Sequence, residues 1–248
     1  MRRSIAVFIL SLLAVLASAQ RTHASGMNLR WDRCYGDGGV INKDFACNRN
    51  TGTNVLVGSF QLDQAIPQVV GVEFLVDVNA AAATLPAWWQ FRNSGSCRAS
   101  SLGVNFAQNA QDVVCVDWAA GQQAGGIGAY SLGVLGFNTA TISGVTAVPQ
   151  VAVADLQSGV EYFSFNVTIN NTKTVGTGNC AGCTVPVCLA LRQMRIDIPN
   201  GVAATFTQAA HAPNSNYVSW QKGTGIVPFA NGNCAGFDSA GFAVNTSA

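Results

Sequence analysis

The eight cysteines constrain the fold of this chain more than any other feature, because their chemistry depends on the compartment in which the chain folds. The chain begins MRRSIAVFILSLLAVLASAQ, where two arginines precede an apolar run and Ala17-Ser18-Ala19 fits a small-x-small cleavage site. We therefore predict a signal peptide over residues 1–19 and a secreted protein, extracellular or on the cell surface. The apolar run is too short to span a bilayer, and no other stretch is long and apolar enough, so we expect no membrane span in the mature chain.

An even number of cysteines in an exported chain predicts a disulfide framework. Short separation in the sequence favours the pairs Cys34–Cys47 and Cys97–Cys115, because each brackets a polar loop. Each closed loop of this size stabilises the folded state by about 3 kcal/mol through the unfolded chain. The full set is Cys34, Cys47, Cys97, Cys115, Cys180, Cys183, Cys188 and Cys234.

The last four cysteines are open to three interpretations. A zinc site needs two chelating pairs, and only one Cys-x-x-Cys is present. A redox pair needs a helix after the motif, whereas CAGCTVPVCLAL runs into a proline and a β-branched segment. Two disulfides are the favoured interpretation, with Cys180–Cys183 across a tight turn and Cys188–Cys234 tying the C-terminal segment to the last long strand. We expect no metal and no cofactor.

The charge balance excludes one class of partner. The whole chain has 13 basic and 12 acidic residues, and loss of Arg2 and Arg3 leaves 11 against 12, a net charge of −1. Such a surface has no reason to attract nucleic acid or anionic lipid. Charged residues are only 10% of the chain, and weakly charged surfaces associate readily.

The periodicity predicts strands. Residues 71–78 alternate apolar side chains with Glu73 and Asp77, and residues 160–169 place Phe163 and Phe165 on one face. In 187–198 the apolar phase shifts between Leu191 and Met194, which indicates a bulge. Residues 79–85 could form one or two helical turns. Further strands are expected at 27–31, 54–62, 88–92, 102–106, 113–118, 129–134, 139–148, 203–206 and 217–220.

Many short strands separated by turn residues predict an all-β fold, a disulfide-stapled antiparallel β-sandwich of the jelly-roll or immunoglobulin/cohesin-like kind. We expect an N-terminal segment over residues 20–26 and a single sandwich domain over 27–221. A C-terminal segment over 222–248 is expected to be tied to it by Cys234.

Several strings together resemble a family of uncharacterised secreted bacterial proteins rich in cysteine. The resemblance covers nearly all of residues 27–221 and implies one recurring extracellular β-sandwich module without an assigned activity. Beyond Gln221 the chain departs from the pattern. The strings are WDRC at 31–34, FACN at 45–48, VGSF at 57–60, LPAWWQF at 85–91, CVDW at 115–118, NTKTVGTG at 171–178 and CAGCTVPVC at 180–188.

Catalytic residues are scarce. The chain has two histidines, and His211 in QAAHAPNS reads as an exposed loop residue without a nucleophile elbow. Glu73 and Asp77 share a strand face that looks solvent-exposed, so a glycosidase pair is not indicated. Asp32, Asp37 and Asp44 could offer oxygen ligands to calcium, but their spacing does not match an EF-hand and a solvated turn is favoured.

The tryptophans are the stronger functional lead, and the binding candidates are Trp88, Trp89 and Trp118. If Trp88 and Trp89 lie on a strand, they face opposite sides, and one ring is exposed for a sugar or a partner protein. Otherwise we expect the binding surface at the glycine-rich loop at 121–128 or in the C-terminal segment after Gln221.

Three functions remain open. The first is a secreted non-enzymatic structural or surface-associating module, which the disulfides, the low charge and the missing catalytic sets favour. The second is a module that binds a carbohydrate or another ligand through an exposed tryptophan. The third is a glycoside hydrolase-like enzyme. The expected partners are a second copy of the chain, a glycan or a surface polymer.

Overall fold

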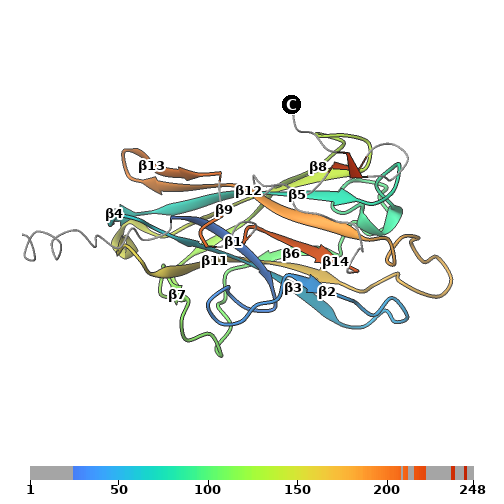
Figure 1. Ribbon diagram of the computed structural model, residues 1–248, viewed down its shortest axis with the longest axis horizontal. Coiled ribbons are helices and arrows are strands. Elements are labelled where there is room, and N and C mark those ends of the chain that lie inside the picture. The colour runs from blue at the N-terminus through green and yellow to red at the C-terminus, as the bar shows by residue number, and fades with distance from the viewer. Residues whose placement is uncertain (1–24, 208, 212–214, 222–235, 238–242, 245–248) are drawn as a thin grey trace, which may run out of the picture.

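The computed structural model describes residues 25–207, 209–211, 215–221, 236–237 and 243–244. Within these residues the protein is an all-β sandwich of two sheets with two short 3-10 helices, which confirms the predicted fold class (Figure 1). The expected signal peptide, Cys234 and most of the C-terminal segment lie outside the described residues.

The first sheet is built around β3, which pairs with β1 on one side and β11 on the other. All its pairings are antiparallel except that of β7, which runs parallel to β11. The strands, in spatial order, are β1 (Gly26–Trp31), β3 (Thr53–Gln61), β11 (Glu161–Asn170) and β6 (Leu102–Asn105), with β7 (Val116–Asp117) also on β11.

The second sheet is centred on the pairing of β12 with β5, and β8 forms one of its edges. In spatial order its strands are β2 (Asn42–Lys43), β14 (Tyr217–Trp220), β12 (Val187–Ile198), β5 (Gly71–Ala80), β9 (Thr139–Ala147) and β8 (Ala124–Leu132), with β13 (Gly201–Phe206) also on β12. The smaller elements are β4 (Ile66–Val69), β10 (Ala154–Leu156), β15 (Gly236–Phe237), β16 (Ala243–Val244), η1 (Ala87–Trp89) and η2 (Gln150–Ala152).

The core forms where the inward faces of the two sheets meet. On β5 the apolar positions of the alternation are buried, as predicted, and Phe74 stacks on Phe165 of the opposite sheet with ring centroids 3.7 Å apart. Each ring leans over a glycine of the neighbouring strand, Gly144 and Gly58, where a Cβ atom would overlap the ring. These glycines let the two phenylalanine rings lie between the sheets.

The long strands confirm part of the sequence pattern and correct another part. The register of β12 shifts between Leu191 and Gln193, which confirms the predicted bulge. A second shift, between Phe163 and Phe165 on β11, separates two rings that were expected on one face. Phe163 packs instead with Val57 against the disulfide of Cys34.

The disulfides connect segments that are far apart in the sequence. They join Cys34 to Cys115, Cys47 to Cys183, and Cys97 to Cys180, so the predicted pairs Cys34–Cys47, Cys97–Cys115 and Cys180–Cys183 are wrong. The bridges close separations of 81, 136 and 83 residues, and the chain-entropy model assigns loops of this size about 4–5 kcal/mol each. Cys188 is also disulfide-bonded, and the predicted Cys188–Cys234 pair lies partly outside the described residues.

Candidate functional site

The three tryptophans expected to offer a binding surface are buried. Trp88 and Trp89 lie on η1 rather than on a strand, and both are fully buried, while Trp118 is 3% exposed. The two rings were expected on opposite faces of a strand. Pro86 instead begins a 3-10 turn, in which adjacent side chains are not directed to opposite sides, so both rings enter the same core. The expected exposed ring at 88–89 is therefore wrong, and residues 88–92 form no strand.

Trp88 and Trp89 instead belong to an aromatic cluster at one end of the sandwich. Both rings lie within about 5 Å of Trp220, at centroid distances of 4.8 and 5.2 Å. The Trp88 indole N–H donates to Thr174 at 3.0 Å, whereas the Trp89 indole N–H has no partner among the described residues.

Arg98 completes this end of the molecule. It is 1% exposed, and its guanidinium lies 3.5 Å from the centroid of the Trp88 ring. Its Nε, Nη1 and Nη2 atoms donate to the carbonyl oxygens of Thr172, Trp88 and Asn170. Burial lowers the pKa of Arg98 to about 9. Because each of its three nitrogens donates to a protein carbonyl, Arg98 connects η1 to the segment that follows β11 and has a structural role.

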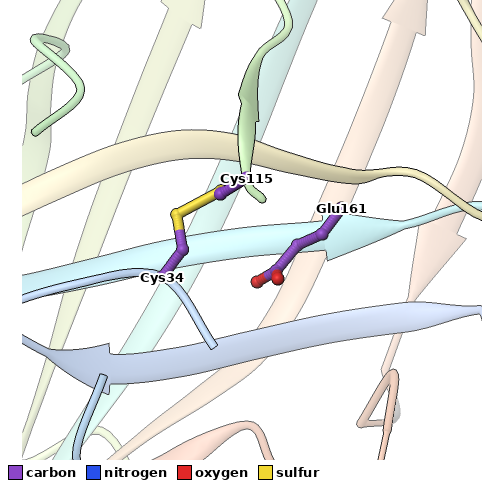
Figure 2. Close-up of side chains that lie close together, drawn as sticks. All are labelled: Cys34, Cys115 and Glu161. Carbon is purple, nitrogen blue, oxygen red and sulfur yellow. A yellow bond between two sulfur atoms is a disulfide. The ribbon is translucent and has the colours of Figure 1, made fainter. Parts of the chain in front are cut away.

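A second polar cluster surrounds a buried carboxylate. Glu161 at the start of β11 is 6% exposed, and one carboxylate oxygen accepts from Ser59 and, at 3.1 Å, from the backbone N–H of Tyr35. The other oxygen accepts from the backbone N–H of Gly36 at 2.8 Å. Figure 2 shows this carboxylate pointing toward the Cys34 side of the Cys34–Cys115 disulfide.

An open pocket adjoins this cluster. It has a volume of about 500 Å³ and is lined by Arg30, Tyr35, Gly39, Val40, Ile41 and Asn42. Arg30 is 4% exposed, and its guanidinium carbon lies 4.8 Å from the centroid of the Tyr35 ring. A Cβ atom at Gly39 would overlap the Arg33 carbonyl oxygen and the Cβ of Arg30, so only glycine lets the loop cross Arg30 this closely.

His211 borders the same cluster and is half-buried, so its expected position as an exposed loop residue is wrong. Its ring stacks on Tyr35 with centroids 4.2 Å apart, and Nδ1 lies 3.1 Å from the amide oxygen of Asn28. Burial, together with the charge of Arg30, lowers the pKa of His211 against the opposing pull of Glu161. Ser59 and Ser215 belong to this hydrogen-bonded group, but neither hydroxyl bonds the His211 ring among the described residues, so no nucleophile–base pair is formed there.

The aspartates of the 32–44 loop are held by protein donors. Asp37 accepts from the backbone N–H groups of Val113, Val114 and Cys115. Asp112, on the facing loop, bonds Arg33 at 2.7 Å. Two groups of side chains have metal-ligand spacing among the described residues, and both include Cys34, whose sulfur is in a disulfide and is no thiolate. Asp37 and Asp112 are already paired, so neither group fits a metal.

Glu73 and Asp77 lie on the outer face of β5, as expected, where both are paired. Glu73 bonds Arg195 and Asp77 bonds Arg192. These two carboxylates, paired to arginines on the neighbouring strand, do not form an acid pair of the glycosidase kind.

The strand β8 is the second candidate surface. It runs along an edge of its sheet, and six of its nine residues are exposed while two more are half-buried. Only the Tyr130 side chain is buried, and its hydroxyl donates to the carbonyl oxygen of Trp89. The last residue of β8 and the turn after it expose four large apolar side chains, Leu132 (45%), Val134 (56%), Leu135 (61%) and Phe137 (86%).

The sequence reasoning missed Arg30, Tyr35 and Glu161. In β1 the polar residues Asn28 and Arg30 alternate with Leu29 and Trp31, which reads as a solvent-facing side, yet every residue of β1 is buried. No local pattern reveals this burial, because the partners of Asn28 and Arg30, Glu161 and Ser215, lie far away in the sequence.

Comparisons with known proteins give little more. No protein-family model and no curated protein matches the chain. Among solved structures it is similar to the cohesin module from the Clostridium perfringens ATCC13124 family 33 glycoside hydrolase, with a TM-score of 0.34 and 10% sequence identity, over 80% of this chain and 94% of that module. No helix in the described part of the chain has the length and apolar character to cross a membrane.

Proposed function

We propose that the protein is a secreted, non-enzymatic β-sandwich module that associates with further copies of itself through the edge of β8. The observation that carries this proposal is the length and neutrality of the edge. Residues 124–132 contain no charged residue and no proline, and they make no backbone–backbone hydrogen bond other than those to β9 within the described chain.

An edge of this kind is a ready template for another strand. Its outward N–H and C=O groups can form a ladder with an incoming chain, and natural proteins normally block this with charges, proline or a covering segment. The edge of β1 is covered in that way, because Ala210 donates to Met27 and Leu29 donates to Ser215. Within the described residues β8 carries no charge or proline and pairs with no strand besides β9, although β6 of the other sheet lies close to it and a bulge at Gly128 shifts its register.

A second copy of the chain is the occupant that the chemistry favours. Two β8 strands related by a twofold axis meet antiparallel, and neither presents a charge to repel the other. A net charge near zero leaves little long-range repulsion between copies. The apolar turn formed by Leu132, Val134, Leu135 and Phe137 adds surface that association removes from water. The bulge limits each continuous ladder to a few residues, so the association is weak and reversible.

The test compares two exposed alanines on two sheet edges. Ala129→Lys places a charge on β8, and Ala203→Lys places the same charge on the β13 edge. Sedimentation equilibrium over a wide concentration range should show self-association in the parent and in Ala203→Lys, and a monomer in Ala129→Lys. A parent that stays monomeric at all concentrations would overturn the proposal, as would equal association in both variants.

A further inference from the structure

The contrast between two buried arginines points to a ligand site. Arg98 is 1% exposed, and each of its three nitrogens donates to a carbonyl oxygen. Arg30 is 4% exposed, yet only Nη1 donates, to the carbonyl oxygens of Leu29 and Ser215 at 2.7 Å each. Among the described residues, the Nε and Nη2 donors of Arg30 have no partner.

Arg30 also has no counterion among the residues that the structure describes. None of the salt bridges in the described part of the chain involves it, and the carboxylate of Glu161 is taken up by backbone and side-chain donors. A guanidinium so far removed from water is normally paired. The unpaired donors of Arg30 are not sealed in the core, because the residue lines an open pocket of about 500 Å³.

We propose that this pocket binds a monocarboxylate, held by the Nε–Nη2 side of Arg30. The planar fork of a guanidinium matches the two oxygens of a carboxylate. A monoanion fits better than a phosphate dianion, because among the described lining residues only Arg30 is cationic, and the charge of the buried Glu161 already acts on the Arg30 guanidinium. This site is separate from the β8 edge and does not rest on self-association.

The walls of the pocket define the rest of the ligand. Tyr35 contributes an aromatic side chain to the lining, and Val40 and Ile41 contribute aliphatic ones. Asn42 accepts from the Ser219 hydroxyl through its Oδ1 atom at 2.7 Å, which leaves its amide N–H groups as donors. The carboxylate is therefore carried on a compact ring or aliphatic body. An acidic sugar and a peptide C-terminus share this chemistry.

The experiment follows the Arg30 Nε–H signal by proton–nitrogen NMR. The probes are glucuronate and N-acetyl-leucine, with glucose and N-acetyl-leucinamide as their neutral counterparts. We expect the signal to shift saturably with at least one carboxylate, with a Kd on the order of millimolar for so open a site, and with neither neutral compound. The carboxylate that binds more tightly, glucuronate or N-acetyl-leucine, shows whether the natural ligand is an acidic sugar or a peptide C-terminus.

Two matched variants guard against a change of fold. Val40 and Val145 are each 43% exposed, and only Val40 lines the pocket. Val40→Asp should weaken carboxylate binding about tenfold or more, whereas Val145→Asp should bind as the parent does. The proposal is overturned if neither carboxylate shifts the Arg30 signal up to tens of millimolar, if the neutral compounds shift it equally, or if Val40→Asp binds as tightly as the parent.

Discussion

Two regions of the molecule are held in opposite ways. The stapled end consists of η1 with residues 93–101 and 171–186. It contains almost no strand, and Cys47–Cys183 and Cys97–Cys180 fix it together with the Trp88 cluster and Arg98. The β8 edge is a regular strand that the hydrogen bonds to β9 hold, with the Tyr130 side chain as its buried anchor.

The difference shows what each kind of backbone requires. An irregular segment has no ladder to satisfy its carbonyl groups, so Arg98 donates to two of them, those of Trp88 and Thr172, and disulfides limit the freedom of the unfolded chain. A strand satisfies its backbone on one side through its neighbour, and an edge strand leaves the other side open. The stapled end is therefore closed, whereas the β8 edge can accept a further strand.

The largest expected effect comes from removing a bridge of the stapled end. The double variant Cys97→Ala, Cys180→Ala opens a separation of 83 residues and should lose about 2–5 kcal/mol in the free energy of unfolding. Urea denaturation of the variant and the parent measures the loss. A loss well below 1 kcal/mol would show that the aromatic cluster alone holds this end.

The two adjacent tryptophans should both be essential. Trp88→Ala and Trp89→Ala should each cost about 3–5 kcal/mol, since both rings are fully buried. The phenylalanine variants separate them. Trp88→Phe removes a donor and leaves Thr174 without it, whereas Trp89→Phe removes an unpaired buried N–H, so Trp88→Phe should be the more costly by about 1 kcal/mol. The reverse order in thermal unfolding would contradict the assignment.

A smaller effect depends on pH and involves Asp37, which belongs to neither region. Burial acts to raise the pKa of Asp37, but backbone N–H groups of residues 113–115 and then Arg33 outweigh it, so the pKa lies below the ordinary 3.8. The folded state is therefore favoured by ionised Asp37 above pH 3.8, and this contribution is lost as the pH falls through the lower folded value.

Asp37→Asn should accordingly flatten the acid side of the stability profile, measured by thermal unfolding from neutral pH downward. Asp63→Asn, at an exposed position with no pairing among the described contacts, serves as the control and should follow the parent. Identical acid profiles for Asp37→Asn and the parent would count against the role of these backbone donors.

The smallest effect on stability is expected at the turn beyond β8. Phe137 is 86% exposed, so Phe137→Ser should change the free energy of unfolding by no more than about 0.5 kcal/mol. The same variant should weaken self-association, because it removes apolar surface from the contact. A marked loss of stability would mean that the turn packs against the fold and is no free surface.

The sequence predicted the regular part of the molecule well and the irregular part badly. The strands at 187–198 and 217–220 were predicted with their observed bounds, because alternation and bulges are local properties of the chain. The cysteine pairing failed because nearness in sequence says little once strands carry Cys34 and Cys47 to different neighbours. Trp88 was expected on a strand, and aromatic residues favour strands, but it lies in the 3-10 turn that begins after Pro86.

The functional candidates also differ in whether a local pattern or a long-range contact reveals them. The glycine-rich segment at 121–128 was expected to be a loop, but residues 124–128 form the first part of β8. Arg30 escaped notice because its significance lies in which of its donors are left without a partner, and that depends on Ser215, Tyr35 and the 39–42 loop. No single-sequence pattern reports a missing contact.

Hydrogen exchange at low and high protein concentration tests the central claim most directly. In dilute protein the outward-facing amides of residues 124–132 should exchange rapidly, while those of β12 at the centre of its sheet are protected. At high concentration the β8 amides should become protected and the β13 amides should not. Protection of β8 that does not depend on concentration, or that rises equally on β13, would contradict an open edge that pairs with its own copy.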